Sequence, residues 1–98
     1  MAELAQSDIT ELANKWHVTG EVLVDNANLI FKKSAAFKMV GEIEVDFSGV
    51  SNVDTSALSL MLEWQRRAVS NGSSVKFANL PADLISLADL YGVESFLS

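Results

Sequence analysis

The chain contains no cysteine, one histidine and one proline among its 98 residues. Without cysteine it can form neither a disulfide framework nor a thiolate metal site. The single histidine, His17, cannot by itself build a zinc or catalytic centre. The composition therefore argues against metal and thiol chemistry, and we expect no metal site and no cofactor.

Long apolar runs and basic clusters are also missing. No stretch approaches the roughly 20 apolar residues needed to span a bilayer. The first ten residues carry Glu3 and Asp8 and no lysine or arginine ahead of an apolar run, which is unlike a secretory signal. The formal net charge of -6 disfavours nucleic acids and anionic lipid surfaces, which are bound mainly through clustered Lys and Arg. We expect a cytoplasmic protein that binds no nucleic acid and does not insert directly into a membrane.

What the chain does have is the composition of a folded globular domain, 49% hydrophobic and 20% charged. Its length suits one domain over residues 1–98, with a single core but no room for a deep active site between two domains. We therefore expect a module that is monomeric when isolated and acts on a partner.

Local patterns predict strands that alternate with helices. Strands over residues 9–12 and 16–19 form a hairpin, a helix covers about 25–37, and a strand over 43–47 is followed by a turn over 48–52. The main helix begins after Asp54 and ends near Ser70, before Asn71-Gly72. A strand over 75–78, a helix over 81–91 and a turn over 94–97 follow. The fold class is α/β, with a mixed sheet of about four to five strands and three to four helices packed on it.

The main helix carries more apolar surface than one face of a sheet can cover. One face, expected to be core, comprises Leu58, Met61, Leu62, Gln65 and Val69. An adjoining sector comprises Ala57, Leu60, Trp64 and Ala68. Either the helix over 81–91 covers this second sector, or Leu60 and Trp64 form an exposed partner-binding flank beside Ser56 and Arg67, because an aromatic side chain near an arginine is a common interface anchor.

The start of this helix is the strongest candidate site. Asp54 is placed to be the N-cap, and Thr55 and Ser56 put two hydroxyls in the first turn, where free N–H groups favour a capping oxygen, an anion or a phosphate. The plainer interpretation is that three small polar residues merely begin a helix. A catalytic nucleophile would need a base, and Asp54 is the only local candidate, so we expect no catalytic residue.

The order of motifs resembles the STAS domain family. Along the chain this order has a strand, then the segment from Asp46 to Val50, then the triplet Val53-Asp54-Thr55. A long helix, the pair Asn71-Gly72 and a further strand follow. That family includes anti-sigma-factor antagonists and the small subunit of the Mla lipid-asymmetry ABC transporter. The resemblance implies a STAS fold and a non-catalytic binding function.

The two branches of the family imply different roles for the two hydroxyls. In the antagonists the pattern is an Asp, then a Ser or Thr, then a phosphorylated Ser, then Gly and Leu. This pattern makes Ser56 the implied phosphate acceptor, although Ala57 stands here in place of the Gly. The implied partner of this branch is an anti-sigma factor kinase. The Mla subunits commonly have Gly where this chain has Ser56, and there the implied critical residue is Thr55. A phosphate on either hydroxyl would act mainly on a docked partner.

A second motif favours the Mla branch. The segment Leu87-Ala88-Asp89-Leu90-Tyr91 matches a Leu-Ala-x-Leu-Tyr segment of the Mla subunits. This resemblance implies binding to the cytoplasmic ATPase of an ABC transporter that also contains permease and substrate-binding subunits. The complex would lie at the inner membrane and move phospholipids, which maintains outer-membrane lipid asymmetry. The expected partner-binding residues are Asp54, Thr55, Ser56, Leu60, Trp64 and Arg67.

Overall fold

The computed structural model describes residues 7–96, which form one α/β unit. Within them the strands are β1 (Asp8–Leu12), β2 (Lys15–Val22), β3 (Glu42–Val53) and β4 (Ser74–Ala78), and the helices are α1 (Ala27–Ser34), α2 (Thr55–Ser70) and α3 (Ala82–Leu90). A 3-10 turn, Glu94–Phe96, follows α3. Glu3, used in the argument against a secretory signal, and residue 97, the end of the predicted turn, lie outside the described residues. The predicted α/β class is confirmed.

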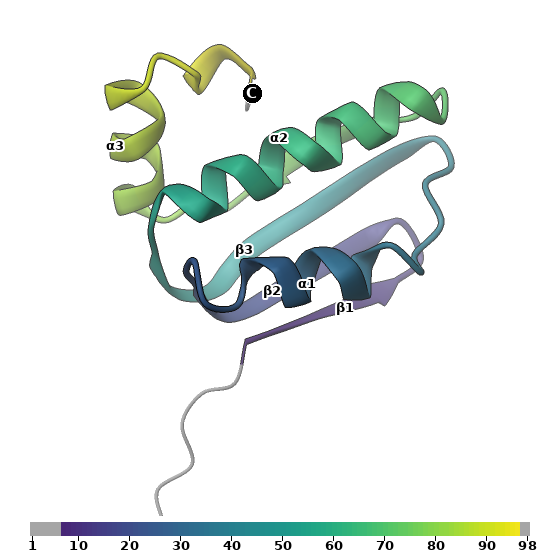
Figure 1. Ribbon diagram of the computed structural model, residues 1–98. Helices are drawn as coiled ribbons and strands as arrows, with labels where there is room; N and C mark the ends of the chain where they lie inside the picture. The colour runs from purple at the N-terminus through teal and green to yellow at the C-terminus, as the bar shows by residue number, and fades with distance from the viewer. Residues whose placement is uncertain (1–6, 97–98) are drawn as a thin grey trace, which may run out of the picture.

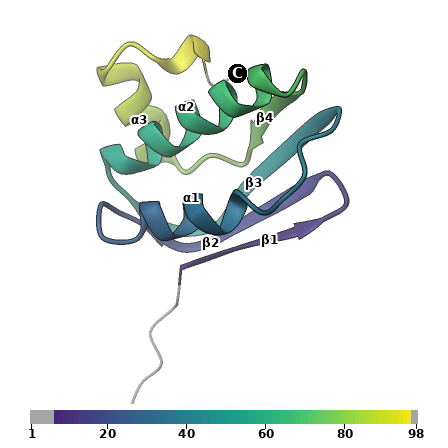
Figure 2. The same ribbon diagram turned by 45° about the vertical axis from the view of Figure 1, so that its right-hand side comes forward.

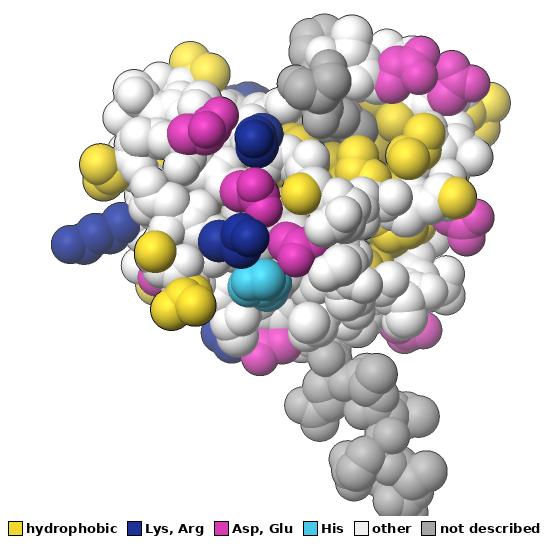
Figure 3. All heavy atoms as spheres, turned by 180° about the vertical axis from the view of Figure 1, so that it is seen from behind, with side chains coloured by type: hydrophobic (Ala, Val, Ile, Leu, Met, Phe, Trp, Pro, Cys, Tyr) yellow, Lys and Arg dark blue, Asp and Glu magenta, His cyan; other side chains and the backbone are white. Residues whose placement is uncertain are grey.

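The strands form one mixed sheet in the order β1-β2-β3-β4. The β1–β2 pair is antiparallel, whereas the β2–β3 and β3–β4 pairs are parallel, because α1 and α2 supply the crossovers that parallel neighbours require. Both helices lie across the same face of the sheet, and α3 stands beside the first half of α2 (Figures 1 and 2). The opposite face carries charged side chains and His17 (Figure 3).

The hairpin prediction is confirmed, but the predicted turn over residues 48–52 is wrong. These residues continue β3, which pairs with β2 through two register irregularities. Gly49 lies opposite Thr19, and a Cβ on Gly49 would approach Thr19 Cγ2 to 2.9 Å. This glycine therefore serves a close approach between two strands and not a turn.

The first helix is shorter than expected, ending at Ser34 instead of near Phe37. The carbonyls of Ser34, Ala35 and Phe37 accept hydrogen bonds from the Arg67 guanidinium on α2. The chain after Ser34 therefore turns toward Arg67 instead of continuing the helix.

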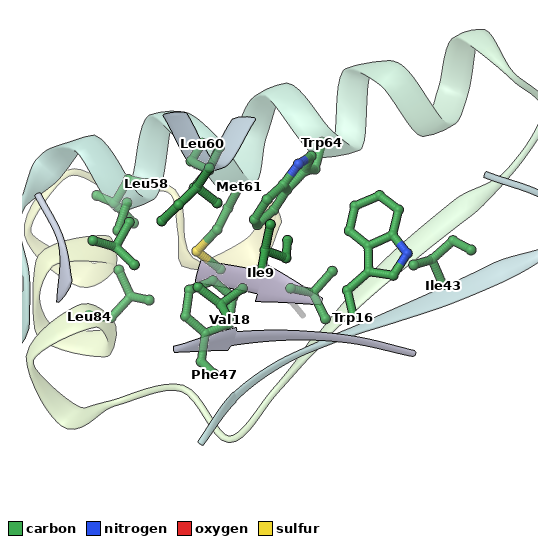
Figure 4. Packing of buried hydrophobic residues seen from close by; sticks show 14 of the residues in the cluster. Ile9, Trp16, Val18, Ile43, Phe47, Leu58, Leu60, Met61, Trp64 and Leu84 are labelled. Atoms are coloured by element: carbon green, nitrogen blue, oxygen red, sulfur yellow. The ribbon is translucent and has the colours of Figure 1, made fainter. Parts of the chain in front are cut away.

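The core lies between the helical face of the sheet and the underside of α2. Apolar residues alternate along the central strands, as a sheet with one buried face requires. In Figure 4 they lie below α2 and meet the side chains that point down from it. The largest fully buried members are Trp16, Trp64, Phe47, Ile9, Ile30, Ile43, Met61 and Leu84.

The buried stripe of α2 differs from the predicted one. The residues that face inward are Ala57, Leu58, Leu60, Met61, Trp64 and Ala68. Val69, expected in the core, is 79% exposed, and Leu62 is only half-buried. The buried face of α2 is therefore turned toward α1. The adjoining sector of Ala57, Leu60, Trp64 and Ala68, which seemed to exceed what the sheet could cover, belongs to the core.

Candidate functional site at the start of helix α2

Asp54 organises the start of α2 with both of its carboxylate oxygens. Oδ1 accepts the Ser56 N–H at 2.8 Å, which confirms the predicted N-cap. Oδ2 accepts the Val24 N–H at 3.0 Å, from the loop that joins β2 to α1. The backbone N–H of Asp54 in turn donates to the Val22 carbonyl. One side chain therefore fixes the helix start and the neighbouring loop together.

The electrostatics at this point favour the ionised carboxylate. Partial burial of Asp54 acts to raise its pKa, but the hydrogen bonds from the Ser56 and Val24 N–H groups outweigh it, and the net pKa lies below the usual value. Because both oxygens already accept backbone donors, Asp54 is bound in a structural role. His17 lies on the opposite face of the sheet (Figure 3), where its Nδ1 is 3.3 Å from Asp46 Oδ2.

Thr55 and Ser56 lie on the two flanks of the same helix end. Thr55 is exposed and borders a shallow hollow of about 290 Å³ on the α3 side. The other residues of this hollow are Leu58, Ser59, Leu62, Tyr91 and Val93. Ser56 is half-buried and borders a hollow of about 280 Å³ on the α1 side. The other residues there are Val24, Ala27, Asn28, Phe31, Ser59, Leu60 and Glu63.

Ser59 borders both hollows, so the exposed edge of α2 forms a ridge between them. Exposed apolar side chains stand on either side of it: Val24 is 71% exposed and Tyr91 is 58% exposed. Small hydroxyl residues on a ridge between apolar rims allow a second protein to approach closely. The Val24 rim was not predicted, because the Asp54–Val24 hydrogen bond that places it joins residues 30 positions apart.

The exposed flank predicted for Leu60 and Trp64 is wrong. Trp64 is fully buried and Leu60 is 4% exposed. They are covered from the α1 side, where the Trp64 indole N–H donates to Ser34 Oγ at 2.8 Å and Leu60 lines the hollow with Phe31. The alternative cover, α3, packs elsewhere on α2. Neither side chain presents the surface on which its expected partner contact depended.

Arg67 also occupies a different position from the one expected. Its guanidinium donates to the carbonyls of Ser34 (2.7 Å), Ala35 (3.3 Å) and Phe37, just past the end of α1. The guanidinium carbon lies 5.9 Å from the centre of the Trp16 ring, within cation–π range. The planar fork of donors therefore fastens the loop that follows α1 to α2.

Within residues 7–96 no helix combines the length and the apolar character that crossing a membrane would require. The same residues contain no group of three or more His, Cys, Asp or Glu side chains arranged to hold a metal ion.

Comparison with known proteins agrees with the geometry. Residues 6–98 match the family described as "Mlab, STAS domain", so the chain belongs to this STAS family. Members of such families are generally non-catalytic binding modules. No curated protein matches the chain.

Among solved structures, the chain is similar to one described as "Crystal Structure Analysis of Mglu", with a TM-score of 0.60 and 14% identity. The match covers 76% of this chain and 19% of that one, so this chain corresponds to about a fifth of the other protein. At this identity the likeness concerns the fold alone.

Proposed function

We propose that this chain is a non-catalytic STAS subunit that binds the cytoplasmic ATPase of an Mla-type ABC transporter. In this role it supports assembly and activity of a complex that moves phospholipids and maintains outer-membrane lipid asymmetry. The observation that carries the proposal is the ridge at the start of α2, where Ser59 stands between two apolar-rimmed hollows and exposed Thr55 borders the one on the α3 side. The Mlab family match supports this partner.

In this proposal the chain lies in the cytoplasm and reaches the inner membrane only through the transporter. Thr55 lies within the contact, while Asp54 holds the ridge and the Val24 rim in place. Leu60, Trp64 and Arg67 act indirectly, by keeping α1 and α2 together beneath the surface. Neither the fold nor this surface calls for a cofactor.

A second function, that of an anti-sigma-factor antagonist, is favoured by one observation. Ser56 offers a hydroxyl at the position where that branch is phosphorylated, and it borders an open hollow. A phosphate on Ser56 would add about -1.5 to -2 charge beside Asp54 and Glu63, and would therefore repel an acidic partner surface. Its partner would be an anti-sigma factor kinase.

Affinities for the two purified partners separate the functions. Titration calorimetry would measure binding of the transporter ATPase and of the anti-sigma factor kinase to the wild type, Thr55→Glu, Ser56→Ala and Ser56→Asp. The transporter function predicts ATPase binding that Thr55→Glu abolishes and Ser56→Ala barely alters. The antagonist function predicts kinase binding that Ser56→Asp abolishes.

A matched control is Thr10→Glu, which places the same charge on an exposed threonine of β1. Circular dichroism would show that each variant is folded. If Thr55→Glu binds the ATPase as tightly as the wild type does, the ridge is not the contact surface.

A further inference from the structure

β4 is an edge strand with an open side. It pairs only with β3, so within residues 7–96 no strand lies along its outer edge. Such an edge offers backbone N–H and C=O groups that a further extended chain can pair with. β4 alternates as a half-covered strand does: Val75 and Phe77 are half-buried, whereas Ser74 and Lys76 are exposed.

A groove with mainly apolar walls runs beside this edge, under the second half of α2, and Glu63, Arg66 and Arg67 also line it. α3 stands beside the first half of α2 only (Figure 1). Leu62, Gln65 and Val69 follow one another on a single face of the helix. They line the same hollow as Ser73, Ser74 and Val75. Val69 is 79% exposed whereas Leu62 and Gln65 are half-buried, so the groove is open at its Val69 end.

The other face of the sheet carries a row of alternating charges that stops at β4. Lys15 of β2 lies opposite Glu44 of β3, which lies opposite Lys76 of β4. The first two form an ion pair of 3.4 Å. Figure 3 shows basic and acidic side chains following one another across this face. Lys76 is the only charged residue of β4 and has no ion pair within 4.0 Å among the described residues, although Glu42 lies on the same face.

We propose that the β4 edge binds an extended segment of a partner protein, which adds a fifth strand to the sheet. Its apolar side chains, at alternate positions, would enter the groove formed with Leu62, Val69 and Val75. An acidic residue between them would lie opposite Lys76 and continue the charge row, because opposite charges in directly paired positions stabilise a sheet. This surface meets the hollow beside Thr55 at Leu62, but it is centred on the other half of α2 and on β4.

A second copy of this chain is a poorer occupant. Symmetric antiparallel pairing of two β4 strands centred on Lys76 would place two lysines opposite each other. Like charges in paired positions are destabilising. The charge row therefore selects an acidic segment from another protein.

The test uses two synthetic peptides, acetyl-Thr-Val-Glu-Val-Thr-Val-amide and its twin with Lys in place of Glu. Each is titrated into the isotope-labelled chain while NMR follows backbone amide shifts and hydrogen exchange. We expect the Glu peptide to shift the β4 amides and slow their exchange. We expect it to bind about three to ten times more tightly than the Lys peptide, with this preference reversed in Lys76→Glu.

Two further variants make the test specific. Val69→Lys places a charge in the groove at an exposed position, so it should abolish binding without unfolding the chain. Lys32→Glu, an exposed charge reversal on α1, should leave binding unchanged. Three results would overturn the proposal. They are no shift of the β4 amide signals at millimolar Glu peptide, equal affinities of the Glu peptide for the wild type and Lys76→Glu, or a dimer in sedimentation that Val69→Lys dissociates.

Discussion

The indole N–H of Trp64 donates to the hydroxyl of Ser34 across 2.8 Å, and both side chains are fully buried. The same hydroxyl donates to the Phe31 carbonyl at 2.7 Å, so the two polar groups satisfy each other inside an apolar layer. The Trp64 ring also meets Trp16 edge to face, with 5.8 Å between ring centres. The hydrogen bond between Trp64 and Ser34 joins α2 to α1, and it thereby holds together the two walls of the hollow that Ser56 borders.

Trp64→Ala should therefore lower the free energy of unfolding by about 3–5 kcal/mol, because it leaves a large cavity and removes the N–H donor from the buried Ser34 hydroxyl. Urea denaturation followed by circular dichroism would measure the change. Trp64→Phe should cost less, since it keeps most of the volume and loses the hydrogen bond. The control is Val69→Ala at an exposed position of the same helix, expected within about 0.5 kcal/mol of the wild type. A Trp64→Ala protein as stable as this control would contradict the conclusion that the buried Trp64 side chain stabilises the core.

Arg67 is expected to stabilise the loop after α1 through geometry as well as charge. Arg67→Ala should lower the free energy of unfolding by about 1–3 kcal/mol, since hydrogen bonds from a charged group to three carbonyls are lost. Arg67→Lys should recover little, because an ammonium group cannot reproduce the planar fork. Within residues 7–96 the ion pair of the neighbouring Arg66 is with Glu63, at an exposed position, so Arg66→Ala serves as the control. Equal effects at the two positions would refute the loop-fastening role.

The sequence was sufficient for features set by neighbouring residues. The Asp54 cap, the end of α2 near Asn71-Gly72 and the alternation in β3 all depend on local chemistry, and the structure confirms them. The errors concern features set by distant residues. Gly49 in a polar segment is typical of a turn, and only its pairing with Thr19 shows that it belongs to a strand. The inward face of α2 is likewise decided by the position of α1, which no spacing along α2 encodes.

Gly49→Ala should destabilise the fold by about 1–3 kcal/mol, because the added Cβ would lie 2.9 Å from Thr19 Cγ2 and 3.3 Å from the Val18 carbonyl oxygen. A double-mutant cycle with Thr19→Ala tests the cause. Removing the Thr19 methyl relieves the first contact and not the second, so Gly49→Ala should cost less in the Thr19→Ala background yet still cost something. Strictly additive free energies of unfolding would show that the contact with Thr19 is not responsible.

Asp54 should make part of the stability of the domain depend on pH. Its pKa is lower in the folded chain than in the unfolded chain, where it is about 3.9, so the ionised carboxylate stabilises the fold above that value. This contribution is lost as the pH falls through the folded pKa, when the carboxyl group binds a proton. Asp54→Asn cannot titrate and can accept only one of the two backbone N–H groups at its single oxygen.

At pH 7 we expect Asp54→Asn to be about 1 kcal/mol less stable than the wild type, because one of the two backbone N–H groups loses its acceptor and the other loses a charged one. Between about pH 5 and pH 3 the difference should shrink, because the wild type loses its ionised cap while the variant has none to lose. Asp46, whose pKa is lowered chiefly by the Asn79 side-chain hydrogen bond, titrates in both proteins and cancels from the comparison. Urea denaturation at several pH values would measure the difference, and a constant value from pH 7 to pH 3 would mean that the Asp54 charge does not stabilise the start of α2.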